Sequence, residues 1–99
     1  MPLSDKQLRF LRGRAHALKP VIQIGNNGLT AGVLAETRRA LADHELIKLR
    51  IQAADRAGRA ALLAELVRAT GGSLVTRIGH VAVLFQANLK LSKFPLPER

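Results

Sequence analysis

The run Gly25-Asn26-Asn27-Gly28-Leu29 constrains the fold of this chain most, because it separates an apolar segment from an amphipathic one. Residues 21–24 before it are mostly apolar, which favours a strand, and Thr30 after it can cap a helix. Two glycines keep side chains away from the turn, and the start of a helix offers free N–H groups and a positive dipole end. We expect this turn to seat an extended anionic ligand directly on the backbone.

The charge of the chain indicates which anion this is. The 16 Lys and Arg against 7 Asp and Glu give a net charge of +9 over 99 residues, which is typical of nucleic-acid-binding proteins. The turn does not match the phosphate loop of nucleotide-binding proteins, since neither Lys-Ser nor Lys-Thr follows Gly28, and it does not match the dinucleotide fingerprint. We therefore expect a nucleic acid and no small-molecule substrate.

Length and composition set the broad class. A chain of this length supports one core, and the absence of cysteine fits a reducing compartment. The first residues lack an apolar signal core, and no run approaches the roughly 20 apolar residues that cross a bilayer. We expect a single cytoplasmic domain without membrane contact, with a monomer favoured. The expected domain covers residues 1–86, and residues 87–99 form a basic tail with at most loose docking.

Caps and apolar periodicity predict three helices. They run from Ser4, in a capping box with Gln7, to before Pro20; from Thr30 to about His44; and from Asp55 to Thr70, before Gly71-Gly72. Their predicted inward faces carry Leu8, Leu11, Ala15 and Leu18; Val33, Leu34, Thr37, Ala40 and Leu41; and Ala60, Leu63, Leu66 and Val67.

Four strands are predicted at residues 21–24, 46–52, 74–78 and 81–86, the last two joined by a hairpin through Gly79-His80. Strands separated by helices are expected to be parallel with right-handed crossovers, and the hairpin adds one antiparallel strand. The order α-β-α-β-α-β-β then gives an α+β fold, α/β-like in its two or three layers, with a four-stranded mixed sheet.

Basic residues near the turn are the candidate phosphate contacts. Asn26 and Asn27 can hydrogen-bond phosphate or ribose. The candidate cations are Lys6, Arg9, Arg12 and Arg14 on the first helix, Lys19 before the first strand and Lys48 in the second. Lys6 and Arg9, like Arg56 and Arg59, lie in first turns of helices, where a cation opposes the helix dipole, so stability does not explain them. Lys48 and Arg50 fit a role in phosphate contact and a place on the solvent face of a strand equally well.

Neither catalysis nor base stacking has a clear signature. His16, His44 and His80 lack metal-ligand spacing, and no nucleophile-base arrangement can be assembled, so we expect no enzyme, no cofactor and no metal. Three phenylalanines make no stacking platform for bases. Phe85 is expected in the core and Phe10 half-buried, which leaves Phe94 as the aromatic residue that can meet a base.

Two segments together resemble a known family. They are Ala15-His16-Ala17-Leu18-Lys19-Pro20-Val21-Ile22-Gln23-Ile24-Gly25-Asn26-Asn27-Gly28-Leu29-Thr30 and His44-Glu45-Leu46-Ile47-Lys48. The chain is similar over residues 3–86 to the CRM family, the chloroplast RNA splicing and ribosome maturation domain, and to its bacterial single-domain, YhbY-like members in particular. The resemblance implies a fold similar to the C-terminal domain of translation initiation factor three, an RNA-binding Gly-x-x-Gly loop and association with precursors of the large ribosomal subunit.

The resemblance also implies roles for the matching residues. Gly25 and Gly28 take the places of the family's loop glycines, and the flanking positions that match are Lys19, Pro20, Thr30 and Lys48. Many members carry a basic residue inside the loop, whereas Asn26 and Asn27 are neutral, so flanking cations would supply most of the affinity. The leading expectation is a non-enzymatic protein that binds ribosomal RNA. A sequence-independent nucleic-acid or polyanion binder and a protein-interaction module on the ribosome are the alternatives.

Overall fold

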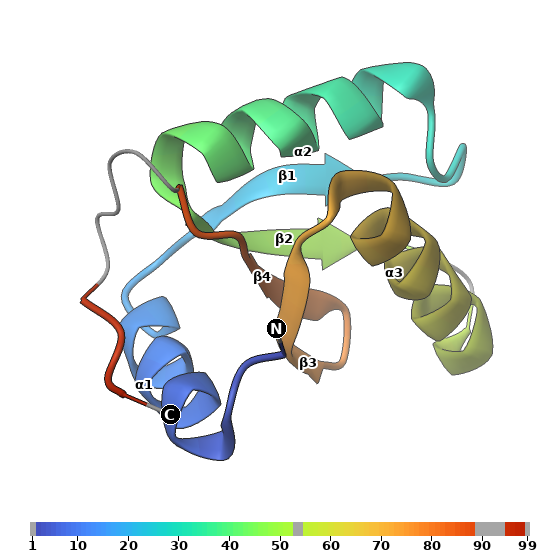
Figure 1. Cartoon of the computed structure of the whole chain (residues 1–99). Coiled ribbons are helices and arrows are strands. Elements are labelled where there is room, and N and C mark those ends of the chain that lie inside the picture. The colour runs from blue at the N-terminus through green and yellow to red at the C-terminus, as the bar shows by residue number, and fades with distance from the viewer. Residues whose placement is uncertain (1, 53–54, 89–94, 99) are drawn as a thin grey trace.

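The computed structural model describes residues 2–52, 55–88 and 95–98 (Figure 1). Its elements follow in the order α1 (Asp5–Ala15), β1 (Pro20–Ile24), α2 (Ala31–His44), β2 (Leu46–Ile51), α3 (Arg56–Thr70), β3 (Ser73–Ile78) and β4 (Val81–Phe85). The predicted order of helices and strands is therefore confirmed, with small shifts at the strand ends.

The four strands form one mixed sheet in the order β1-β2-β4-β3. β1 and β2 are parallel, and β4 is antiparallel to both of its neighbours, β2 and β3. The single antiparallel strand was predicted, and the structure adds that it lies inside the sheet. Four of the five β4 residues are buried, which suits a strand covered on both faces.

Helices cover both faces of the sheet, so the fold has three layers (Figure 1). On one face, α2 and α3 pack through Leu41, Leu63 and Leu66 against side chains that include Ile24, Leu49 and Leu84. On the other face, α1 packs through Leu11 and Ala15 against Leu46, Val75, Val83 and Phe85. Phe85 is in the core and Phe10 is half-buried, as predicted, while Phe94 lies outside the described residues.

Side-chain caps fix the starts of the helices where the sequence predicts them. Ser4 Oγ accepts the Gln7 N–H at 3.2 Å and Gln7 Oε1 accepts the Ser4 N–H at 3.0 Å, which completes the capping box. Thr30 Oγ1 accepts the Val33 N–H at 3.1 Å, and Asp55 Oδ1 accepts the Gly58 N–H at 2.7 Å. These local bonds satisfy N–H groups that the first turn of a helix leaves unpaired.

The described parts of residues 87–99 contact the body of the protein, in contrast to the loose docking expected for the tail. Asn88 N–H donates to Glu45 Oε2 at 2.6 Å, and Gln7 Nε2 donates to the Pro97 carbonyl at 3.1 Å. Leu96 packs beside the core under α1. Nothing in the local sequence around Glu45 predicts this docking, and its side chain is fully buried. The tail residues Lys90, Lys93 and Arg99 lie outside the described residues.

Candidate nucleic-acid interface

The loop of residues 25–28 joins β1 to α2 and is closed by its own backbone. Gly28 N–H donates to the Gly25 carbonyl at 3.1 Å, and Thr30 N–H donates to the Gly28 carbonyl at 3.1 Å. Gly28 has φ of +69°, a conformation that favours glycine. A Cβ on Gly25 would meet nothing within 4 Å. The backbone therefore explains glycine at position 28, whereas nothing around position 25 requires it.

The loop presents donors and positive potential to solvent. Asn26 and Asn27 are exposed, and the first turn of α2 contains no acidic residue. The amide groups of Ala31 and Gly32 open the helix, so they have no carbonyl of the same helix to bind. Free amides and the positive end of the helix dipole make this surface suited to an anion such as a phosphodiester.

Three connections meet at one edge of the sheet, which we call the carboxyl edge because β1 and β2 both end there. Gln52 N–H donates to the Ile24 carbonyl at 2.8 Å, and Ile51 N–H donates to the His80 carbonyl at 2.7 Å. His80 Nδ1 also lies 3.0 Å from the Ile51 carbonyl oxygen. The 25–28 loop, the connection into α3 and the turn between β3 and β4 therefore share this edge.

The carboxyl edge also carries an arginine cluster whose members come from α3 and β3. Arg56, Arg59 and Arg77 line a cavity of about 110 Å³ together with Gly79. None of the three forms an ion pair within the described residues. The unfavourable position of Arg56 and Arg59 at a helix start was a signal for them. Arg77 joins them because β3 follows α3 through Gly71-Gly72 and runs back beside it, which sequence spacing does not show.

The face of the sheet under α1 is covered at one end only. Beyond α1, paired residues form a row across all four strands. We call this row the open sheet face, and it consists of Gln23, Arg50, Val81 and Ile78. Arg50 is exposed and Lys48, in the next row, is half-buried. Both cations point to the α1 side, because Ile47, Leu49 and Ile51 take the side of α2 and α3.

The structure brings some of the predicted cations together and separates others from the loop. Arg12 and Lys48 line one cavity, and Lys19 and Lys48 line a second of about 420 Å³. Lys19 lies at the opposite end of β1 from the loop, roughly 16 Å away for a five-residue strand. The predicted residues therefore fall into two regions: Arg12, Lys19 and Lys48 beside the sheet, and Gly25, Asn26, Asn27, Gly28 and Thr30 at the carboxyl edge.

The remaining predicted cations lie on the exposed side of α1. Lys6 and Arg9 belong to its first half, farther along the helix from the cavity that Arg12 lines. The Arg14 guanidinium lies 5.7 Å from the centre of the Phe10 ring, an arrangement typical of a cation–π contact. These three are accessible to a long ligand, but none of them lines a cavity with Lys48.

The described residues contain neither a metal-binding group of side chains nor a membrane-spanning helix. Within the described residues, no three His, Asp or Glu side chains are grouped so that they could hold a metal ion. His16 follows α1, His44 ends α2 and His80 lies in the hairpin turn, as predicted. No helix of the described chain is long and apolar enough to cross a membrane.

Comparison with known proteins identifies the family. The CRS1 / YhbY (CRM) domain matches residues 3–86. The chain belongs to the CRM domain family. This CRM protein is 45% identical to an RNA-binding protein of Haemophilus influenzae over 97 residues, which cover 98% of this chain and 97% of that protein. It is also 45% identical over 93 residues to a probable RNA-binding protein of Pseudomonas aeruginosa, covering 94% and 89% of the two chains.

A solved structure supports the fold of this CRM protein. The solution structure of a hypothetical protein from Staphylococcus aureus aligns with a TM-score of 0.83 at 30% identity, covering 96% of this chain and 99% of that one. The family resemblance and the predicted α+β class, with three helices and a four-stranded mixed sheet, are therefore confirmed.

Proposed function

We propose that this CRM protein is a non-enzymatic RNA-binding protein that binds ribosomal RNA in precursors of the large ribosomal subunit and assists their assembly. The observation that carries the proposal is the 25–28 loop, where a Cβ on Gly25 would meet nothing within 4 Å and where Asn26, Asn27 and the first two residues of α2 are exposed. An RNA backbone can approach the two glycines of such a loop closely, because they have no side chains. The names of the bacterial relatives support RNA as the ligand class.

The chemistry of the loop favours recognition of the backbone over recognition of base sequence. Backbone amides, Asn26 and Asn27 are suited to phosphate oxygens and to the ribose 2′-hydroxyl, and contacts of this kind position a protein without reading bases. Arg12, Lys19 and Lys48 add positive charge and form no ion pair within the described residues. The protein is then expected to select a folded RNA by its shape.

A general polyanion binder is the second candidate, and the net charge of +9 favours it. Such a protein would bind duplex DNA and structured RNA equally, because the 2′-hydroxyl would not be recognised.

A protein-interaction module on the ribosome would instead remain bound to its partner after the RNA has been digested.

Sedimentation of cell extract separates these functions. We expect the tagged protein to sediment with large-subunit precursors and to leave those fractions after ribonuclease treatment. The double variant with Arg12→Ala and Lys48→Ala should lose this association, whereas a matched control with Arg39→Ala and Arg68→Ala on the outer surfaces of α2 and α3 should keep it. Association that survives ribonuclease, or an even distribution over all RNA-containing fractions, would contradict the proposal.

A further inference from the structure

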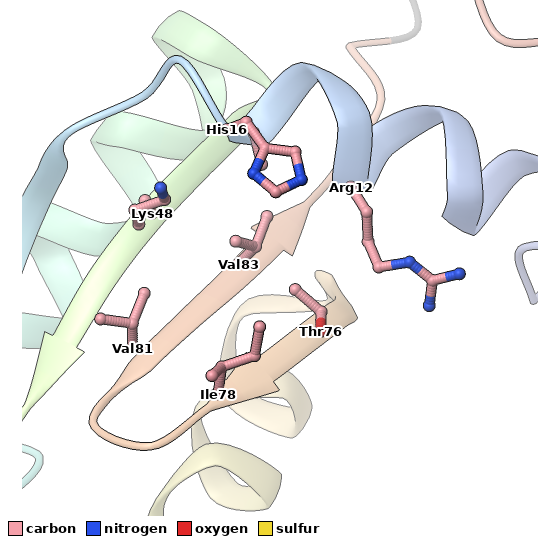
Figure 2. Close-up of a pocket in the computed structure, with 8 residues that line it drawn as sticks. Arg12, His16, Lys48, Thr76, Ile78, Val81 and Val83 are labelled. Carbon is pink, nitrogen blue, oxygen red and sulfur yellow. The ribbon is translucent and has the colours of Figure 1, made fainter.

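A cavity of about 110 Å³ lies where α1 ends above the sheet (Figure 2). Its volume is several times the roughly 30 Å³ that one water molecule occupies in the liquid. Figure 2 shows Arg12 of α1 and His16 just after it and, across the cavity, side chains from β2, β3 and β4. The full lining is Arg12, Ala15, His16, Lys48, Thr76, Ile78, Val81 and Val83.

The floor of this cavity is apolar, and its accessible part is Ile78 with the half-buried Val81, since Val83 is only 2% exposed. Val81 and Val83 come from β4, whose backbone is hydrogen-bonded to strands on both sides, so the floor has few backbone groups to offer a ligand. Ile78 is 75% exposed, which is unusual for a large aliphatic side chain on a sheet. Exposed apolar surface within a polar rim marks binding sites on soluble proteins.

The rim of the cavity carries positive charge without compensation. Arg12 and Lys48 stand on it, and Arg50 is paired with Val81 at its edge. None of these three forms an ion pair within the described residues, and the lining contains no Asp or Glu. An apolar floor below cations fits a ligand that joins a flat apolar group to anionic groups on either side.

We propose that this cavity holds one unpaired nucleobase of a single-stranded RNA segment, with the neighbouring phosphates on Arg12 and Lys48. The inference rests on the proposed function and extends it to a second contact, beside the sheet and away from the 25–28 loop. One face of the base lies against Ile78 and Val81, and Thr76 and His16 provide hydrogen-bonding groups for its polar edge. The base must be unpaired, because a base inside a duplex has its faces stacked on its neighbours.

A phosphate site and a protein contact explain these features less well. A site for phosphate alone would not need three aliphatic side chains as its floor, since phosphate binds through hydrogen-bond donors and cations. A hydrophobic protein partner would not need uncompensated cations around so small a floor. A nucleotide unit accounts for both the floor and the rim.

Methyl NMR tests the inference directly, because the domain is small enough for complete assignment. Addition of a short oligouridylate should shift the methyl resonances of Val81 and Ile78, because the base lies against these methyl groups. An abasic ribose-phosphate oligomer of equal length should leave them in place while it still shifts the amides of the 25–28 loop. RNA binding without shifts of these methyls would overturn the inference and leave the proposed function intact, whereas no RNA binding at all would overturn both.

A pair of matched variants gives a second test. Ile78→Ala should weaken binding of the oligouridylate about fivefold, because the variant loses apolar contact equal to roughly one buried methylene group, and the salt dependence should be unchanged. Leu74→Ala is the control, since Leu74 is 41% exposed and lies on the opposite side of the same strand, facing α3. Equal affinity of the Ile78 variant and the control would overturn the inference. Methyl shifts that depend on protein concentration without RNA would also overturn it, by assigning this surface to a second copy of the chain.

Discussion

At the scale of single residues, Gly25 and Gly28 lie in one loop under different constraints. Gly28 has φ of +69°, where an added Cβ strains the backbone, whereas Gly25 has an ordinary φ and open space around it. Gly28→Ala should therefore lower the free energy of unfolding by about 1 kcal/mol. Gly25→Ala should leave stability unchanged or slightly raised and should weaken RNA binding, because the new methyl group occupies the surface that faces the ligand.

Urea denaturation and RNA titration of both variants check this prediction. The informative result is a Gly25→Ala variant that keeps its stability and binds RNA more weakly. Full RNA affinity in that variant would show that the ligand does not approach the loop backbone closely.

Negative charge can be added to the neutral loop without disturbing the fold. Asn26 and Asn27 are exposed and precede the positive end of α2, where carboxylates are favourable. The double variant with Asn26→Asp and Asn27→Asp should keep its thermal stability and bind RNA about thirtyfold more weakly, since each carboxylate repels a nearby phosphate by about 1 kcal/mol in water. The double change to Ala is the neutral control. Equal binding by the Asp variant would remove the loop from the interface.

At the scale of elements, Gly13 is the least explained residue of α1. A helix interior prefers alanine, and a Cβ on Gly13 would meet nothing within 4 Å, so no close packing against a described strand requires glycine there. Gly13→Ala should raise the free energy of unfolding by about 1 kcal/mol in urea denaturation. A loss of stability would mean that α1 needs this glycine for its own conformation. Weaker RNA binding by the stabilised variant would place the ligand against this side of the helix.

The elements themselves were predictable because their signals are local. Each helix start depends on a cap within three residues, such as Thr30 with Val33, and the end of α3 depends on Gly71 with φ of +78°. The amphipathic faces followed from periodicity for the same reason. These features need no knowledge of the rest of the chain.

The arrangement of the elements depends on contacts that are distant in sequence, and there prediction was incomplete. The pattern of β4 does not show that it inserts between β2 and β3. Nor does it show the irregular register between Leu74 and Thr76. At this irregularity Val75 packs towards α1, and after it Arg77 joins the arginine cluster. Glu45 has φ of +63° and accepts the N–H of Asn88, 43 positions away, a contact that no local pattern encodes.

The candidate site likewise has one part that adjacent residues predict and another that depends on contacts distant in sequence. The 25–28 loop and its helix cap could be located from adjacent residues. The grouping of Arg12 with Lys48 could not, because it requires α1 to cross the sheet above β4. The roles of all these residues in binding stay predictions.

At the scale of the whole molecule, positive charge faces solvent in two regions, one at an end of the sheet and one on the face that α1 covers in part. One lies at the carboxyl edge, with the 25–28 loop and the arginine cluster, and the other lies beside the open sheet face. A single RNA backbone that contacts both regions must follow the sheet between them. The number of phosphates neutralised on binding therefore measures how much of this surface is used.

The most direct test of the account is a titration of the purified protein against ribosomal RNA fragments and matched duplex DNA over a series of salt concentrations. We expect clear preference for RNA and a slope of log affinity against log salt that corresponds to about four to six phosphates. The double variant with Arg12→Ala and Lys48→Ala should lower that number by about two, whereas the control with Arg39→Ala and Arg68→Ala should not change it. Equal affinity for RNA and duplex DNA, or no RNA binding at moderate salt, would contradict the account.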